Sequence, residues 1–375
     1  MRNSGLHTKA RTLALLVLCA ALAAGAASCS LFGKKDNKPI QRPRPVRPQA
    51  FDFKFALQPG ATYSGTFFLD ESAQITTADE SGMFAAMAPL RFDLAMTWKV
   101  LEQEKDKTDQ FIIEMILDEI TLASESLDAA AAAEILPRLQ GQKMTLVVND
   151  NGEIEDFHAL DLDALFTQLE EEYKRKAAPL AVIALAKKQL TWDMMVERFG
   201  MAFRFTPQPD EDDAAADSKR KKTGIVLKKK DDTWSAKPIV VTLPGQMSVP
   251  VELKYKFADL KTDQGASMAH ILFGAKQDLS QYAMSDEVLN GFMARGKRVS
   301  QKTGAYQTLE AQGYVVYNTT ARDVEEIKAD LKATGKITLT PRRGNPVEGQ
   351  LELKRTFLLS MAQKQEAQEA SGTGK

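Results

Sequence analysis

The sequence has few of the residues from which metal and catalytic sites are usually built. Both cysteines, Cys19 and Cys29, lie close to the N-terminus, so the rest of the chain cannot form an internal disulfide and must rely on a packed core. Only His158 and His270 follow the first ten residues. This scarcity excludes histidine-rich metal sites and makes a Ser-His-Asp triad hard to assemble.

The chain also lacks the short motifs that mark common enzymes. It has no nucleophile elbow, phosphate-binding loop, dinucleotide fingerprint or zinc-binding helix. Ligand-type residues cluster once, from Glu153 to His158, but a strand there would direct the glutamates and His158 to opposite faces. His270 lies in an apolar strand pattern, which favours a structural role. We therefore expect no enzyme, no catalytic residue, no metal site and no cofactor.

Neither sign of charge dominates the composition. The chain has 49 basic and 50 acidic residues, and the first eleven residues hold three of the basic ones and no acidic one, which leaves 46 against 50 in the remainder. This near balance predicts no nucleic-acid partner. After Gly33 no apolar run is long enough to span a bilayer, because the longest, 177–186, is short and contains Pro179.

An export signal stands at the start of the chain. A basic segment, an apolar run over 12–27 and a group of small residues precede Cys29. Ala26-Ala27-Ser28-Cys29 resembles the lipobox of bacterial lipoproteins, although Ala26 replaces the more usual leucine. The resemblance implies a signal peptide over 1–28, cleavage before Cys29, diacylglycerol on that cysteine and usually a third acyl chain on its amino group. Two or more acyl chains would anchor the protein stably to a membrane.

Two alternatives to this anchor stay open. Ordinary cleavage would release a secreted protein with Cys29 as a single thiol. Alternatively, residues 12–33 are long enough to remain as a helix across a bilayer of roughly 30 Å, although their small residues favour peptidase recognition. Ser30, rather than aspartate, follows the cysteine. In bacteria with two membranes this resembles the default signal for the outer membrane, so we expect a lipid-anchored envelope protein that faces the periplasm there.

Composition divides the remainder of the chain into segments. Residues 29–50 are rich in proline and arginine, which predicts an extended tether that holds the body off the membrane. A first sheet-and-helix half spans 51–206, a charged linker or loop spans 207–233, and a second sheet-and-helix half spans 234–361. The polar residues 362–375 predict a disordered tail.

Alternating apolar residues predict long antiparallel hairpins. The clearest pair covers 92–100 and 111–117, with one polar face, and a second pair covers 249–257 and 266–273. Trp98-Lys99-Val100 is similar to Tyr255-Lys256-Phe257, which suggests a weak internal repeat. A shorter alternation, from Phe51 to Leu57, predicts a further strand.

Helical spacing and capping residues predict helices in five places. The last of them would begin at Ala321, because Thr320 and Asp323 resemble a capping box. The predicted ranges are 129–133 after Asp128, about 162–173, a following segment to about 186, 286–295 after Ser285, and 321–332.

Together these elements predict an α+β fold, mainly an antiparallel curved sheet or half-barrel built from long hairpins, with helices between the two halves. The order of elements, with a turn at Asn151-Gly152 and Trp234 before a strand, resembles uncharacterised sheet-rich envelope lipoproteins. It is more distantly similar to lipoprotein-carrier folds of the envelope. This resemblance assigns no site residue beyond Cys29.

Two functions follow as hypotheses. The first is a non-catalytic, membrane-anchored envelope lipoprotein that binds a hydrophobic ligand or lipid in the curved sheet. It predicts a continuous apolar cavity on the concave face, and a face filled by the protein's own side chains would overturn it. The alternative is a structural or assembly lipoprotein that binds another envelope protein through a flat exposed patch or an edge strand.

Overall fold

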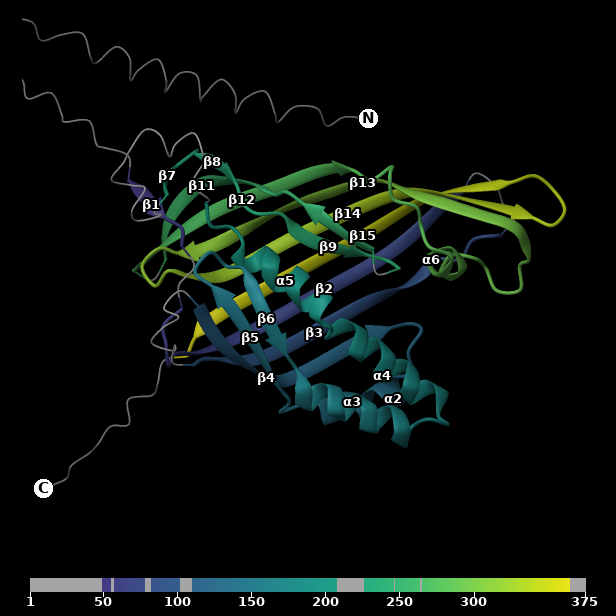
Figure 1. Cartoon of the computed structure of the whole chain (residues 1–375), viewed down its shortest axis with the longest axis horizontal. Helices are drawn as coiled ribbons and strands as arrows, with labels where there is room; N and C mark the ends of the chain where they lie inside the picture. Colours follow the sequence, from purple (N-terminus) through teal and green to yellow (C-terminus); the bar gives the residue numbers. More distant parts are fainter. Residues whose placement is uncertain are drawn as a thin grey trace, which may run out of the picture. The chain divides into compact units, whose positions relative to one another are not determined.

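An open, eleven-stranded antiparallel sheet forms the main part of the computed structural model (Figure 1). The structure describes residues 49–54, 57–77, 82–101, 110–207, 226–245, 247–263 and 265–364. In spatial order the strands are β6 (Ile154–His158), β5 (Lys143–Asn149), β4 (Gln110–Ser124), β3 (Met87–Val100), β2 (Thr62–Thr77), β15 (Val347–Gln363), β14 (Asp323–Pro341), β13 (Val299–Asn318), β12 (Ala266–Asp278), β11 (Lys254–Asp263) and β8 (Thr233–Ser235).

The centre of the sheet joins the two predicted halves of the body. Strand β2, near the start of the body, pairs with β15, its last strand, over the registers Tyr63↔Gln363 to Thr77↔Gly349. The sheet does not close, because β6 and β8 each have a neighbour on one side only. The prediction of an α+β fold with an antiparallel half-barrel is confirmed.

The strands form because apolar and polar residues alternate along them. On β14, Ala329, Leu331 and Ala333 are buried on the inner face, while the residues between them lie on the outer face. The outer face is held by ion pairs between strands, such as Lys332 to Glu352 at 2.5 Å. One face is therefore apolar and covered, and the other is charged, as expected for an antiparallel sheet with one wet face.

The predicted helix over 321–332 is wrong, because this segment begins β14. Val324 and Ile327 are both buried and three residues apart, which imitates helical spacing. The cause is a β-bulge, since the register to β13 shifts between Val316 and Tyr317. Pairing with β13 and β15 on both sides outweighs the local capping signal.

Most other helices agree with prediction. The side chain of Asp128 caps α2 by accepting a bond from the Ala131 amide, and Ser285 caps α6 in the same way. The helices are α2 (Ala129–Ile135), the 3-10 turn η1 (Leu136–Leu139), α3 (Leu160–Glu172), α4 (Ala177–Gln189), α5 (Trp192–Phe203) and the short α6 (Asp286–Gly291). No described helix is long and apolar enough to cross a membrane.

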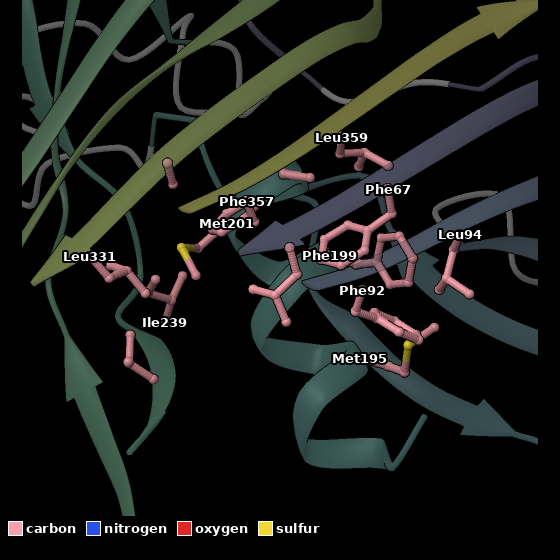
Figure 2. Packing of buried hydrophobic residues seen from close by; sticks show 14 of the residues in the cluster. Phe67, Phe92, Leu94, Met195, Phe199, Met201, Ile239, Leu331, Phe357 and Leu359 are labelled. Atoms are coloured by element: carbon pink, nitrogen blue, oxygen red, sulfur yellow. The ribbon is translucent and has the colours of Figure 1, made fainter. Parts of the chain in front are cut away.

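Helix α5 was not predicted, and it covers the centre of the concave face. It contacts β6 and β14, which are separated by five strands, so the sheet must curve around it. Phe199 packs edge-on against Trp98 of β3, with ring centroids 5.1 Å apart. Figure 2 shows Met195 and Phe199 of α5 directed at Phe67 and Phe92 of the sheet. The main core therefore lies between α5 and the inner side of the half-barrel.

Two small two-stranded sheets complete the body. Strand β9 (Ile239–Leu243) pairs with β10 (Met247–Val251), and β1 (Ala50–Asp52) pairs with β7 (Leu227–Lys229). The strand predicted from Phe51 to Leu57 is thus shorter than expected, and Phe55 lies outside the described residues. Phe53 follows β1 and is fully buried against Trp234.

Several predicted segments fall outside the described residues. They include the signal peptide, Cys29, nearly all of the tether, residues 208–225 of the charged linker and residues 365–375 of the tail, and all of these stay predictions. The described end of the linker forms β7, and β15 extends to Gln363, just past the predicted start of the tail.

A candidate ligand cleft between the half-barrel and its helices

A cleft of about 1060 Å³ lies on the inner side of the sheet, beyond the part that α5 fills. Its floor comes from β2 and the start of β3. Its walls come from the end of α4, the start of α5, the end of β9 and the segment from α6 to Arg295. The cleft is therefore a consequence of where the helices end, because α5 covers the centre of the face and leaves this end open.

Small and flexible apolar side chains make up much of the cleft wall. Ala85, Ala86 and Ala88 flank Met87 on one side, and Ala184 is exposed on the facing helix α4. Alanines cannot reach across the gap, whereas the phenylalanines of α5 do so in the centre. Met87 is 37% exposed, although it lies on the sheet. The wall thus offers apolar surface that no other side chain covers.

A buried charge cluster lies at the base of the cleft and ties four elements together. Arg355 of β15 donates to Glu71 of β2, with Nε and Nη2 at 2.7 and 2.6 Å from Oε2. Its Nη1 donates to Oε1 of Glu197 on α5 at 2.5 Å and to the Thr242 carbonyl of β9 at 3.1 Å. Glu197 also accepts a bond from the Thr242 amide at 2.8 Å. We call Glu71, Glu197 and Arg355 the charge clamp.

Opposite charges keep the clamp ionised despite burial. Burial alone would raise the pKa of Glu71, but the charge and hydrogen bonds of Arg355 outweigh it and hold the pKa below its usual value. Burial would likewise lower the pKa of Arg355, yet Glu71 and Glu197 raise it above the ordinary arginine value. The side chains of Arg355 and Glu197 are only 6% and 2% exposed. All three guanidinium nitrogens of Arg355 are engaged, so the clamp has a structural role.

A second buried arginine stands next to the clamp. The guanidinium of Arg198 lies 4.9 Å from the ring centroid of Phe67 and 5.1 Å from that of Phe92. It also donates to the carbonyl and the side chain of Gln189 at the end of α4. Burial lowers the pKa of Arg198 to about 9, so the group stays protonated at neutral pH. With the clamp it makes a buried set of two cations and two anions.

Two cations of the cleft remain available to a ligand. Lys187 pairs with Glu170 at 2.8 Å, which leaves Lys188 and Arg295. Both are exposed, and neither has an ion-pair partner among the residues that the structure describes. The cleft therefore combines uncovered apolar surface with two free positive charges, a combination that suits an amphiphile with an acidic head.

The residues that the sequence singled out do not assemble into a site. His158 pairs with Asp156 at 2.8 Å on the surface, whereas Glu153 pairs with Lys237 at 2.6 Å. His270 lies within β12, where burial lowers its pKa. Within the described ranges, no group of three or more histidine, cysteine, aspartate and glutamate side chains could hold a metal ion.

The charge clamp escaped sequence reasoning, although a signal for it was present. Glu71 and Arg355 both occupy inward positions of alternating strands, between buried apolar neighbours two residues away. A charged residue at such a position must find an opposite charge. Helix α5 also had a usable pattern, since Met195, Phe199 and Phe203 recur at a spacing of four.

A second exposed feature lies at the edge of the sheet. Strand β6 pairs with β5 alone, so its other side is open. Just beyond it, Leu160 is 77% exposed and Trp192 is 40% exposed. Phe157 packs against Trp192, with ring centroids 6.1 Å apart. These three side chains form a small apolar patch beside an open strand edge.

Comparison with known proteins gives no family. No protein-family model and no curated protein matches the sequence. Among solved structures, similarity is found to the COG4313 outer membrane channel from Pseudomonas putida F1, at 8% identity and a TM-score of 0.15, covering 84% of this chain and 100% of that one. Pseudomonas aeruginosa OccK11 (OpdR) has 6% identity and a TM-score of 0.16, over 83% of this chain and 100% of that one. Similarity at these TM-scores carries no argument about fold or function.

Proposed function

We propose that this protein is a non-catalytic envelope lipoprotein, anchored through acylated Cys29, that binds an amphiphilic ligand of the lipid class in the cleft. The observation that carries the proposal is the cleft itself, a space of about 1060 Å³ on the inner side of a half-barrel. Apolar and polar side chains both line it, among them two unpaired cations and the exposed Asp193. Its volume is at the upper end of the range for small-molecule sites, about 300–1000 Å³.

The apolar part of the wall and the two cations would each bind a different part of one ligand. An acyl chain against Ala85, Met87 and Ala184 would gain about 0.8 kcal/mol for each methylene removed from water. An acidic head group near Lys188 and Arg295 would meet positive charge that the protein leaves unpaired. A purely apolar ligand would leave these cations without an anionic partner. A purely polar ligand would leave the apolar part of the wall exposed to water.

The extent of the binding space is smaller than the sequence suggested. A continuous apolar cavity along the concave face was expected, but Met195, Phe199 and Phe203 of α5 fill its centre. We therefore place the ligand at the open end only. The charge clamp holds α5 over the centre, so we expect the centre to stay dry and the cleft to keep its shape when empty.

The test is a measurement of bound lipid in matched variants. The chain from Ser30 to Lys375, made without its signal and purified without detergent, should carry lipid at near-stoichiometric amounts by mass spectrometry of an organic extract. Ala184→Trp would place a large side chain in the cleft and should reduce the bound lipid several-fold. Ala181→Trp is the control, because Ala181 is exposed on the same helix and does not line the cleft.

If the wild-type protein carries no lipid, or if Ala184→Trp and Ala181→Trp carry as much as the wild type, the ligand proposal is wrong. Circular dichroism and thermal unfolding of both variants establish that each is folded before its lipid content is compared.

The assembly hypothesis is supported by a different observation. The open edge of β6 and the apolar patch of Phe157, Leu160 and Trp192 offer backbone groups and side chains that a protein partner could cover. A lipid-free wild-type protein together with a specific partner recovered from crosslinked envelopes would favour this function over ligand binding.

A further inference from the structure

Basic residues gather at one end of the long strands. Antiparallel pairing sets Val299, the first residue of β13, opposite Pro341, the last residue of β14. The loop that leads into β13 and the turn that follows β14 therefore lie at the same end of the sheet, next to α6 (Figure 1). We call the five basic residues of this loop and turn the basic tip: Arg295, Lys297, Arg298, Arg342 and Arg343.

The four arginines of the basic tip have no ion-pair partner among the described residues. All four are exposed. Two acidic residues on neighbouring elements contact other cations: Asp286 of α6 is 3.5 Å from Lys302, and Glu348 of β15 pairs with Lys336 at 2.8 Å. Elsewhere on the sheet several outward cations, such as Lys276, Lys332 and Lys354, are paired with glutamates. The four arginines thus form a positive surface without ion-pair partners, and such surfaces attract anionic partners.

The basic tip lies far from the point where the chain joins the body. Asp52 of β1 pairs with Arg322 at 3.1 Å, just before the first residue of β14. The basic tip follows the last residue of the same strand. A strand of 19 residues at about 3.3 Å each is about 60 Å long. The body therefore begins with β1 near one end of the sheet, and the basic tip is at the other end.

The cleft reaches the same end as the basic tip. Arg295 belongs to both, because it lines the cleft and lies in the loop after α6. Met293, two residues earlier, also lines the cleft. An antiparallel backbone bridge joins Met293 to Phe84, which precedes β3. A surface that touched the basic tip would therefore lie beside the opening of the cleft.

From this placement we infer that the basic tip docks on an anionic phospholipid surface and brings the cleft opening against it. One guanidinium group can donate two parallel hydrogen bonds to the oxygens of one phosphate. Arginine therefore suits this contact better than lysine. The apolar cleft beside the arginines favours a lipid surface over a soluble acidic protein, since only the former holds molecules that fit the cleft. That this contact serves the cleft rests on the proposed function. Binding of the basic tip to an anionic phospholipid surface does not rest on it.

The test compares two variants that lose the same charge. In the first, Arg295, Arg298, Arg342 and Arg343 are all replaced by glutamine. In the control, four exposed cations elsewhere are replaced by glutamine, namely Lys99, Arg175, Lys254 and Lys261. Both are made in the unacylated chain from Ser30 to Lys375, and binding is measured by flotation with vesicles of phosphatidylethanolamine and phosphatidylglycerol at low salt.

The wild type and the control should bind these vesicles, and the basic-tip variant should bind far more weakly. A cation at an anionic membrane surface contributes about fivefold in affinity, so the loss of four should exceed tenfold. Binding should weaken as salt rises and should be absent with phosphatidylcholine vesicles. Equal binding of the two variants would overturn the inference.

The tether needs its own control because it is also basic. A third variant carries Arg42→Gln, Arg44→Gln and Arg47→Gln. If this variant loses vesicle binding and the basic-tip variant keeps it, the protein binds vesicles through the tether. The inference about the basic tip is then wrong. Lipid content of the Ala184→Trp variant is read separately, so failure of the cleft and failure of the basic tip are distinguishable.

Discussion

The concave face of the half-barrel has a packed centre and an open end, and the two differ in what the chain places opposite the same kind of strand. In the centre, α5 directs Met195, Phe199 and Phe203 at the sheet, and these side chains fill the space. At the open end, the facing residues include Ala184 and the alanines around Met87, which are too short to meet. Strand pattern alone therefore does not decide whether a curved sheet is filled. The position of the covering helices and the length of their side chains together decide it.

The largest effect should come from breaking the charge clamp, which lies at the base of the cleft and holds α5 over the packed centre. Arg355→Met leaves Glu71 and Glu197 buried without their cation, which should lower the free energy of unfolding by about 3–5 kcal/mol. Urea unfolding followed by tryptophan fluorescence would measure it. Adding Glu197→Gln should restore at least half of the loss, because the charges that then remain, Glu71 and Arg198, balance each other.

The control for the clamp is an arginine on the outer face. Arg91 pairs with Asp93 at 3.0 Å and its side chain is 61% exposed. Arg91→Met should change stability by no more than about 0.5 kcal/mol. A similar loss in both variants would mean that the clamp contributes no more than a surface ion pair.

A matched pair of methionines compares the two regions directly. Met195 is fully buried on the side of α5 that faces the sheet, whereas Met87 is 37% exposed in the cleft. Met195→Ala should cost about 2–4 kcal/mol because it leaves a cavity, and Met87→Ala should cost less than about 1 kcal/mol. Thermal and urea unfolding of both proteins would check this. Equal costs would show that the open end is packed as tightly as the centre.

A smaller effect, of opposite sign, is expected at Asp323 near the tether end. Its carboxyl is buried, has one oxygen without a partner and lies near Glu325, and burial first and Glu325 second raise its pKa to about 6. Above that pH the folded state holds a disfavoured charge. Asp323→Asn should therefore stabilise the protein by about 1–3 kcal/mol above roughly pH 7.

The pH dependence gives the check on this prediction. The advantage of Asp323→Asn should fade as the pH falls from about 6 towards 4, since the wild-type carboxyl then becomes protonated in the folded and the unfolded state. Asp263→Asn, at an exposed position, should show no such trend. A stabilisation that does not change with pH would point to a cause other than the buried charge.

The sequence predicted the strands of the sheet more accurately than the helices that cover its concave face. Alternation along 92–100 and 111–117 predicted β3 and β4, because one buried face demands period two. The bulge beside Val324 broke that period and produced a false helix. No local pattern could reveal the cleft, since it depends on where α4, α5 and α6 meet the sheet. The basic tip likewise needed the register of β13 against β14.

The pairing of β2 with β15 has a consequence for how the chain folds. This pair sets opposite each other residues separated by up to 300 positions, Tyr63 and Gln363. Contacts this distant in sequence make folding slow, because a very long loop must close before they stabilise anything. Until β15 is in place, β2 and β14 each have one unpaired edge, and an exposed strand edge can pair with another chain.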